Sequence, residues 1–284
     1  MNKLCEENYF SQENEKYYTG HSQILSFMDC PARTMAKIRG EWVEETSTAL
    51  LIGSFVDAAI SGTLDIFKAQ HPEILKKDGT LKAEYVHACY ILERIQRDKM
   101  FMKYISGDHQ TIMTAYYNRF TKTWHTPQEA MNLTFVDGNI IPVKIKIDSY
   151  FPEKAIVDLK TVKDFSPVWN DKLKVKQNFI DYWGYTLQGA LYQKVVEVNT
   201  GKKLPFFIAA VTKEKEPDLA LMSVDQETLD EQMDKLQNWG TFDMISEFKN
   251  GISTPTRCGY CDYCKFTKEI TEIINYKFIN GKEE

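Results

Sequence analysis

The fold is decided by two short segments, Val143-Lys-Ile-Lys-Ile-Asp148 and Ala155-Ile-Val-Asp-Leu-Lys160. In both, apolar and polar residues alternate as in a β-strand, where side chains two residues apart project from the same face. The first segment therefore places its two lysines and Asp148 on one face, and the second places Asp158 and Lys160 together. A turn signal with a proline joins the segments, so we expect a hairpin that brings Asp148 and Asp158 close together.

Two carboxylates that converge repel each other unless a cation lies between them. Oxygen ligands with retained waters are what Mg²⁺ prefers, so Asp148 and Asp158 are candidate metal ligands. An ammonium from Lys160 beside such a site can orient a water nucleophile and offset charge on a phosphate oxygen. The competing interpretation is an ordinary solvated sheet face, because an Asp-x-Lys tripeptide is common.

Two predicted helices carry further polar residues. Within Ala49–Ile60, Asp57 is costly to bury unless it is paired or bound to a metal, and a cap or a buried salt bridge is the alternative. Within Phe179–Val198, Gln188 and Tyr192 are one turn apart, so they share a face and offer neutral hydrogen-bond donors. Taken alone, that spacing is equally typical of a surface pair.

The remaining pattern predicts a mixed α/β (α+β) fold in which helices flank a central mixed sheet. Residues 1–21 are polar and read as a flexible N-terminal arm, whereas residues 22–284 read as a single domain. Helices are expected over Ser22–Arg39 (two, divided at Pro31), Ala49–Ile60, Ala83–Tyr104, Phe179–Val198 and Asp225–Phe248. Strands are expected over Thr111–Tyr117, Asn132–Val136, Ile141–Tyr150, Ala155–Lys160 and Leu204–Val211, with a turn at Asp137-Gly138-Asn139.

In chain order, four motifs form one set: Gly53-x-x-x-Asp57, Asp148, Asp158-Leu-Lys160-Thr161 and Gln188-x-x-x-Tyr192. From about residue 22 to residue 264 this order resembles the PD-(D/E)XK nuclease superfamily, in particular its RecB-like branch and the phage RecE-type exonucleases. The resemblance implies a restriction-endonuclease-like core with Lys160 as the catalytic lysine. It implies metal ligands at Asp57, Asp148, Asp158 and the carbonyl of Leu159, and a helix motif near the DNA at Gln188 and Tyr192.

The chain departs from the RecB-like pattern at two places. Asp57 stands where that pattern usually has histidine, and a carboxylate there would favour a hard metal such as Mg²⁺. The acidic residue that sometimes precedes the first active-site strand has no clear counterpart, and Glu129 is the candidate.

The resemblance implies a DNA exonuclease of the phage recombination type that uses Mg²⁺ or Mn²⁺ on linear duplex ends and produces single-stranded DNA. Such an enzyme would work with a single-strand annealing protein and could form a homo-oligomer. One alternative is a RecB-like nuclease of CRISPR adaptation or DNA repair. Two others are a catalytically inactive DNA-binding or assembly module of the same fold, and a metal-binding protein with no role on nucleic acid.

Three of the six cysteines lie within seven residues, in Cys258-Gly-Tyr-Cys261-Asp-Tyr-Cys264. A tetrahedral metal site needs a fourth ligand, and Cys30, just before a proline, is the candidate. RecB-like nucleases with an iron–sulfur cluster have one cysteine before a proline and three after the nuclease motifs, so the resemblance implies a cluster on this quartet. The C-terminal spacing is tighter here than in that pattern, so zinc and free thiols remain alternatives.

Composition and charge limit which partners this protein can have. No apolar stretch approaches the length of about 18 residues that a membrane span needs, and the N-terminus lacks a secretory pattern. We therefore expect a cytoplasmic protein of a bacterial host. The net charge of −5 argues against a polyanionic partner. However, residues 213–249 hold ten acidic and four basic side chains, whereas residues 139–180 hold eight lysines and five acids, so a DNA groove remains compatible.

Three lysines alternate at Lys172, Lys174 and Lys176. This spacing fits a strand or loop edge that presents three ammonium groups to one side, where they could contact phosphates. A solvated edge protected against aggregation is the alternative. Nearby aromatic residues, Trp183 among them, could stack on bases of a frayed end, although core packing is the simpler role for Trp183.

Overall fold

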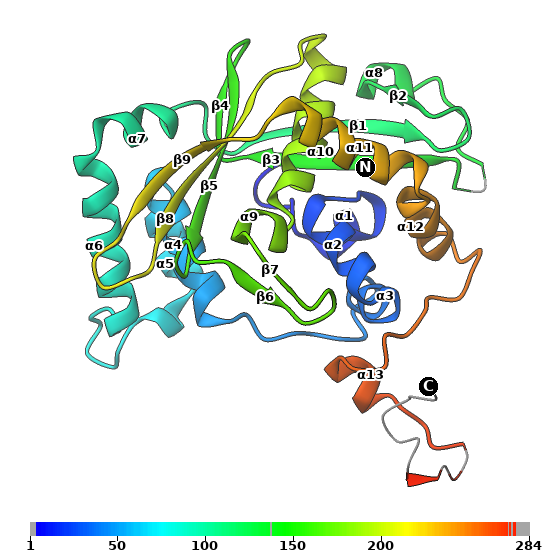
Figure 1. Cartoon of the computed structure of the whole chain (residues 1–284), viewed down its shortest axis with the longest axis horizontal. Helices are drawn as coiled ribbons and strands as arrows, with labels where there is room; N and C mark the ends of the chain where they lie inside the picture. The colour runs from blue at the N-terminus through cyan, green and yellow to red at the C-terminus, as the bar shows by residue number, and fades with distance from the viewer. Residues whose placement is uncertain (1–3, 137, 272, 274, 277–284) are drawn as a thin grey trace.

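The computed structural model describes residues 4–136, 138–271, 273, 275 and 276. Its centre is a four-stranded mixed sheet in the order β4-β5-β8-β9, in which β5 and β8 are parallel and the outer pairs are antiparallel. A three-stranded antiparallel sheet, β2-β1-β3, lies beside it, and β6 pairs with β7 in a separate hairpin (Figure 1). The strands are β1 Thr111–Asn118, β2 Thr123–His125, β3 Ile140–Ile147, β4 Ser149–Phe151, β5 Ala155–Val162, β6 Val168–Asn170, β7 Val175–Gln177, β8 Phe206–Thr212 and β9 Leu219–Ser223.

Helices cover the central sheet on both sides, so the mixed fold expected from the sequence is confirmed. Figure 1 shows α4 to α7 on one side and α10 with the remaining helices on the other. Before the sheet come α1 Gln12–Tyr17, α2 His21–Asp29, α3 Pro31–Arg39, α4 Thr48–Ile60, α5 Leu64–Gln70, a 3₁₀ turn at Pro72–Ile74, α6 Ala83–Arg97 and α7 Lys99–Tyr104. Later helices are α8 Pro127–Ala130, α9 Phe179–Tyr182, α10 Tyr185–Thr200, α11 Gln226–Asn238, α12 Thr241–Lys249 and α13 Asp262–Phe266. No helix in the described part of the chain is long and apolar enough to cross a membrane.

Two hydrophobic cores share the central sheet. Ile156 and Ile208 face the core under α10, whereas their neighbours Val157 and Ala209 face the core under α4 and α6. Because consecutive strand residues point to opposite faces, each of β5 and β8 takes part in both cores. We therefore propose that residues 22–284 form one domain, of which 137, 272, 274 and 277–284 lie outside the described residues.

The N-terminal segment differs from the flexible arm expected over residues 1–21, of which 1–3 lie outside the described residues. It contains α1, buries Tyr9, and adds a parallel bridge between Thr19 and Val143 at the edge of β3. The cause is Lys144, which is only 1% exposed and donates to the carbonyl of Tyr9 and to Glu15 Oε1 at 2.6 Å. A buried ammonium needs such partners, and among the described residues Tyr9 and Glu15 of this segment supply them.

Three predicted helices are each divided in two. Asp98 ends α6 and caps α7 by accepting a hydrogen bond from the backbone N–H of Phe101 at 2.9 Å. Gly184 and Gly240 adopt φ of 69° and 81°, the left-handed region that glycine tolerates, and separate α9 from α10 and α11 from α12. Apolar periodicity continued through all three breaks, so it could not locate them.

The strand predicted over Asn132–Val136 is wrong. The described residues there lie in irregular structure after α8, and Thr123–His125 pairs with β1 instead. The β-branched run is largely exposed, including Phe135 at 49% and Val136 at 51%. Asp137, at the turn predicted with this strand, lies outside the described residues.

Replacing Glu15 with alanine should destabilise the protein, because the buried ammonium of Lys144 would lose its carboxylate partner. A buried charged donor without that partner costs about 1–3 kcal/mol. Urea unfolding should therefore show a lower midpoint for Glu15→Ala than for Glu13→Ala, which changes an exposed residue of the same helix. Equal midpoints would show that the ion pair of Glu15 with Lys144 does not stabilise the fold.

Candidate active site and four-cysteine cluster

The β4–β5 hairpin brings Asp148 and Asp158 together, as the sequence predicts. Asp148 follows β3 directly, and the register pairs Ser149 with Val157, which places Asp148 opposite Asp158. Oδ2 of Asp148 accepts a hydrogen bond from the backbone N–H of Leu159 at 2.8 Å. Leu159 thus contacts the site through its N–H group, and the ligand role expected of its carbonyl stays a prediction.

Asp158 lies at the centre of the site and is 1% exposed. Its Oδ1 accepts a hydrogen bond from Gln188 Nε2 at 2.6 Å. Its Oδ2 lies 2.7 Å from Lys160 Nζ as an ion pair, yet it accepts no hydrogen bond of good geometry from the residues that the structure describes. Lys160 Nζ also lies 4.7 Å from the ring centre of Tyr185, at the start of α10. A buried oxygen with unused lone pairs is suited to a metal ion.

Asp57 joins the site from α4, which packs on β5. Gln110 Nε2 donates to both of its carboxylate oxygens, at 3.1 and 3.0 Å. Gln110 precedes β1 and has φ of 52°. Nothing in the sequence pointed to this glutamine, because neither motif nor periodicity marks a residue just before a strand.

The charges of the site oppose one another. Burial, followed by the charges of Asp158 and Asp57, raises the pKa of Asp148 well above its usual value. Burial also raises the pKa of Asp57, although the nearby Lys146 lowers it. Burial lowers the pKa of Lys160, but the charges of Asp158 and Asp148 outweigh that effect and raise it. The positive charges near the carboxylates therefore do not balance their negative charge, and a bound divalent cation would do so.

Tyr192 lies one turn after Gln188 on α10, on the face that the spacing predicts, and is 7% exposed. Burial, followed by the charges of Tyr9 and the acidic pair, raises its pKa well above the usual value. Its phenol therefore stays protonated at neutral pH. Tyr192 is therefore a buried residue beside Gln188, and its role near the DNA stays a prediction.

Two further residues at the site were not found from the sequence. His21, the first residue of α2, lies 3.0 Å through Nε2 from the carbonyl of Gly184. Burial and the charge of Lys160 lower its pKa to about 3, so the ring is neutral and Nε2–H donates to that carbonyl. Tyr9 lies near Lys144 and Tyr192. Both come from the first 21 residues, so no local pattern could connect them to Lys160.

Glu129 is not part of this site. It forms a capping box at α8, in which its side chain accepts from the backbone N–H of Thr126 at 2.8 Å. The Thr-x-x-Glu spacing is the sequence signal of that motif.

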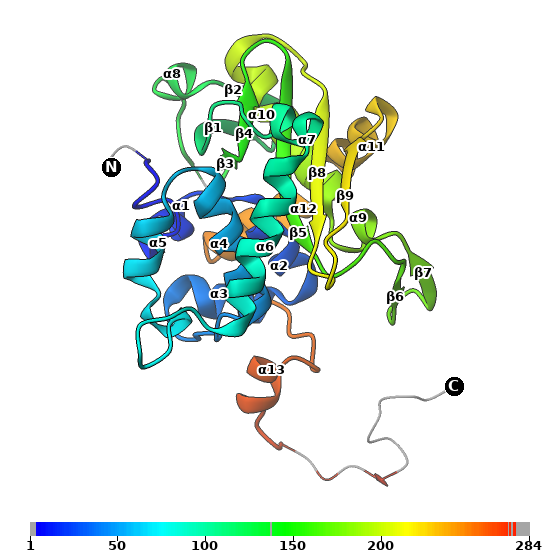
Figure 2. The same ribbon diagram turned by 90° about the vertical axis from the view of Figure 1, so that its left-hand side faces the viewer.

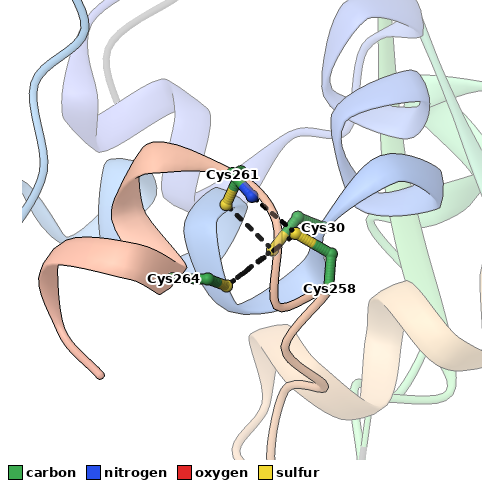
Figure 3. A group of neighbouring side chains, drawn as sticks. All are labelled: Cys30, Cys258, Cys261 and Cys264. Carbon is green, nitrogen blue, oxygen red and sulfur yellow. Dashed lines mark hydrogen bonds between the residues drawn. The ribbon is translucent and has the colours of Figure 1, made fainter. Parts of the chain in front are cut away.

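The four cysteines chosen from the sequence come together in one cluster (Figure 3). Cys30 lies between α2 and α3, Cys258 and Cys261 lie in the segment that leads into α13, and Cys264 lies in α13 itself. The Sγ atoms all lie within 4.8 Å of one another, and three separations are 3.6, 3.8 and 3.9 Å. Cys5 is exposed and Cys89 lies in α6, both outside this cluster.

The thiols of the cluster have divergent pKa values. Burial raises the pKa of Cys261 to about 12, and neighbouring thiols add to this effect. Burial would also raise the pKa of Cys258, but backbone N–H groups of Cys261 and Tyr260 donate to its sulfur and lower the value to about 6. Backbone N–H donors on a thiolate are the supporting contacts that metal-bound sulfur uses.

A model of the PDDEXK-like domain of unknown function, DUF3799, matches residues 20–137 and 120–267. The chain belongs to this PDDEXK-like family. A solved structure of a candidate exonuclease from Eubacterium rectale is 38% identical, covers 99% of this chain and 99% of its own, and has a TM-score of 0.84. A second solved structure, SSO0001, is 10% identical, covers 75% and 82%, and has a TM-score of 0.27, which carries no argument. No curated protein matches the chain.

Membership of the PDDEXK-like family confirms the resemblance read from the motifs. The fold is that of the PDDEXK-like nucleases, and the motif residues Asp148, Asp158 and Lys160 meet on its β3–β5 strands. The individual roles of these residues in this family member stay predictions.

Replacing Asp148 with asparagine should stabilise the metal-free protein, because it removes one of the mutually repelling carboxylates. A pKa raised in the folded state means that folding favours the protonated form, so Asp148 contributes less to stability as the pH rises through that pKa. Thermal melts in EDTA should show Asp148→Asn above wild type at pH 8, with a smaller difference at pH 5. Each unit of pKa shift corresponds to about 1.4 kcal/mol. A variant less stable than wild type at pH 8 would contradict this description of the site.

Proposed function

We propose that this protein is a metal-dependent deoxyribonuclease that acts as an exonuclease on linear DNA. The observation that carries the proposal is the meeting of Asp57, Asp148 and Asp158 with Lys160 in one buried site. Family membership supports phosphodiester chemistry at this site. The description of the Eubacterium rectale protein supports the exonuclease assignment.

Three carboxylates and one carbonyl would bind the metal ion. Asp148, Asp158 and Asp57, with the Leu159 carbonyl, would hold Mg²⁺ or Mn²⁺. Such an ion, when bound, polarises a phosphoryl oxygen and lowers the pKa of a water ligand.

Lys160 places an ammonium beside Asp158, where it can orient a water molecule and offset charge on the phosphate. Gln188 fixes the orientation of the Asp158 carboxylate through Oδ1, and Oδ2 is the oxygen that would bind the cation.

The proposed biological role is that of a phage-type recombination exonuclease that converts duplex ends to single-stranded DNA. The ordered motifs of the RecE type support this role. A single-strand annealing protein would then be the partner that binds the product, and a homo-oligomer would keep the enzyme on its substrate.

Purified protein should degrade end-labelled linear duplex DNA with Mg²⁺ or Mn²⁺, and should leave a closed circle intact. Lys160→Ala and Asp158→Ala should each lower the rate by on the order of 10²–10³-fold, as for the loss of an electrostatic stabiliser. Lys154→Ala, an exposed lysine in the turn of the same hairpin, is the matched control and should keep full activity. The proposal would be contradicted if the wild-type protein left linear DNA intact, or if it cleaved no faster than the Lys160→Ala variant.

The four cysteines favour a second candidate, a RecB-like nuclease of CRISPR adaptation or repair. That enzyme would prefer a single-stranded end of one polarity, so single-stranded substrates labelled at either end separate the two candidates. An inactive DNA-binding or assembly module would bind the same DNA and leave it uncut.

We also propose that Cys30, Cys258, Cys261 and Cys264 bind one structural metal ion, with zinc as the favoured ion. Four thiolates about 2.3 Å from one zinc ion stand roughly 3.8 Å apart in a tetrahedron. Three of the Sγ–Sγ separations, at 3.6–3.9 Å, and the limit of 4.8 Å on all of them support that arrangement. In an iron–sulfur cluster with one thiolate on each iron, iron and sulfide atoms would hold the thiolates further apart. The cluster that the RecB-like resemblance implies is therefore the alternative.

Replacing Cys261 with serine should remove this metal and lower the melting temperature by at least about 4 °C, which corresponds to about 2 kcal/mol in a domain of this size. Cys89→Ser, a half-buried cysteine of α6, is the control. Elemental analysis should find about one zinc per chain and no colour in wild type. Brown protein that contains iron would show that the cysteines bind an iron–sulfur cluster and not zinc. An unchanged melting temperature and metal content in Cys261→Ser would contradict the proposal of a metal site.

A further inference from the structure

A basic hairpin, residues 163–178, is inserted between the two active-site elements. It leaves the end of β5 after Lys160, runs through β6 and β7, and returns to α9 and α10, which carries Gln188. Figure 2 shows β6 and β7 extending from the body of the molecule beside α9. The hydrogen bonds to the three carboxylates come from Gln110, Leu159 and Gln188, which lie outside this extension, so the hairpin is available for another role.

The hairpin carries four lysines against two aspartates, in a protein whose net charge is −5. Lys163 and Lys174 are 94% and 73% exposed, and Trp169 is 49% exposed. The register pairs Trp169 directly with Lys176, so an indole ring and an ammonium lie side by side on one face. An exposed tryptophan among lysines is the combination that binds stacked bases and phosphates.

Contacts at both ends hold the hairpin in place. At its base, Phe165 stacks on Phe179 of α9 with ring centres 5.6 Å apart. At its tip, Lys172 Nζ lies 2.8 Å from Asp29 Oδ1 and 5.3 Å from the ring centre of Tyr260.

The residues that hold the tip are sequence neighbours of the cysteines in the four-cysteine cluster. Asp29 precedes Cys30, and Tyr260 lies between Cys258 and Cys261. The hydroxyl of Tyr260 donates to Asp29 Oδ1 at 2.7 Å, so both loops of the cluster meet at the lysine. The cysteine cluster therefore positions the hairpin, and a surface held in advance loses less entropy on binding.

We propose that the basic hairpin binds single-stranded DNA next to the active site, with Trp169 stacked on a base and Lys174 and Lys176 on phosphates. A single strand fits better than a duplex, because only unpaired bases offer their faces to an indole ring. Lys172 serves as the anchor to the cysteine cluster. This inference rests on the proposed nuclease function for its choice of DNA, but its test does not need cleavage.

The test is fluorescence anisotropy of a labelled 20-nucleotide single strand with the full-length protein in EDTA, which prevents cleavage. Trp169→Ala should weaken binding at least about 5-fold, the lower end of the cost of one lost stacking contact, whereas Trp169→Phe should restore most of the affinity. The logarithm of the binding constant falls as the logarithm of the salt concentration rises. The double variant Lys174→Gln with Lys176→Gln should make this slope shallower by about 1.4, or about 0.7 for each lost phosphate contact.

The matched control is Lys202→Gln with Lys203→Gln, two lysines that precede β8 at the opposite end of the β5–β8 pair. This control should bind as wild type. Melting temperatures and metal content should be unchanged in all these variants, which separates loss of binding from loss of folding.

The outcomes distinguish this inference from the proposed function. Hairpin variants that bind the single strand as tightly as wild type, with an unchanged salt slope, would overturn the inference even if the protein degrades DNA. Equal losses for a blunt duplex and for the single strand would overturn the preference for unpaired bases. Wild type that binds through the hairpin but cleaves no DNA would support the inference and contradict only the nuclease.

Discussion

The repulsion among Asp57, Asp148 and Asp158 is the interaction on which the rest of the structure depends. Each carboxylate comes from a different element, and each is held near the others by contacts from the surrounding fold. Gln110 holds Asp57, the N–H of Leu159 holds Asp148, and Gln188 holds Asp158. Raised pKa values of Asp57 and Asp148 are the cost of this arrangement in the absence of a cation. Perturbed pKa values of this kind are common at functional sites, and the cation proposed above would relieve the repulsion.

Helix α2 connects the active site with the four-cysteine cluster. It begins at His21, which donates to the carbonyl of Gly184 at the start of α10, and it ends at Asp29 beside Cys30. Nine residues of helix span about 13 Å, so the two sites are joined by one short, rigid element. The cysteine cluster therefore ties the C-terminal segment to the helix that supports Lys160 and Gln188, and through Lys172 it also reaches the basic hairpin.

The N-terminal segment has a similar supporting role on the other side of β3. Lys249 of α12 donates to the carbonyls of Glu15 and Tyr18 at 3.1 and 2.8 Å, and burial lowers its pKa to about 7. Together with Lys144, it holds α1 against β3, the strand that leads into Asp148. Two buried lysines thus fix a segment whose composition alone suggests disorder.

The sequence by itself determined the strand alternation, the motif order and the cysteine quartet, because these depend on local spacing and on residue chemistry. It thereby predicted the mixed fold and the approach of Asp148 to Asp158. Tertiary structure alone decided the positions of His21, Gln110 and the N-terminal segment. Their partners lie many residues away in the sequence. A buried lysine or acidic pair needs hydrogen-bond or ionic partners, and in the folded protein these come from distant parts of the chain. The helix breaks at Asp98, Gly184 and Gly240 depend on a capping aspartate and on two left-handed glycines, which apolar periodicity does not mark.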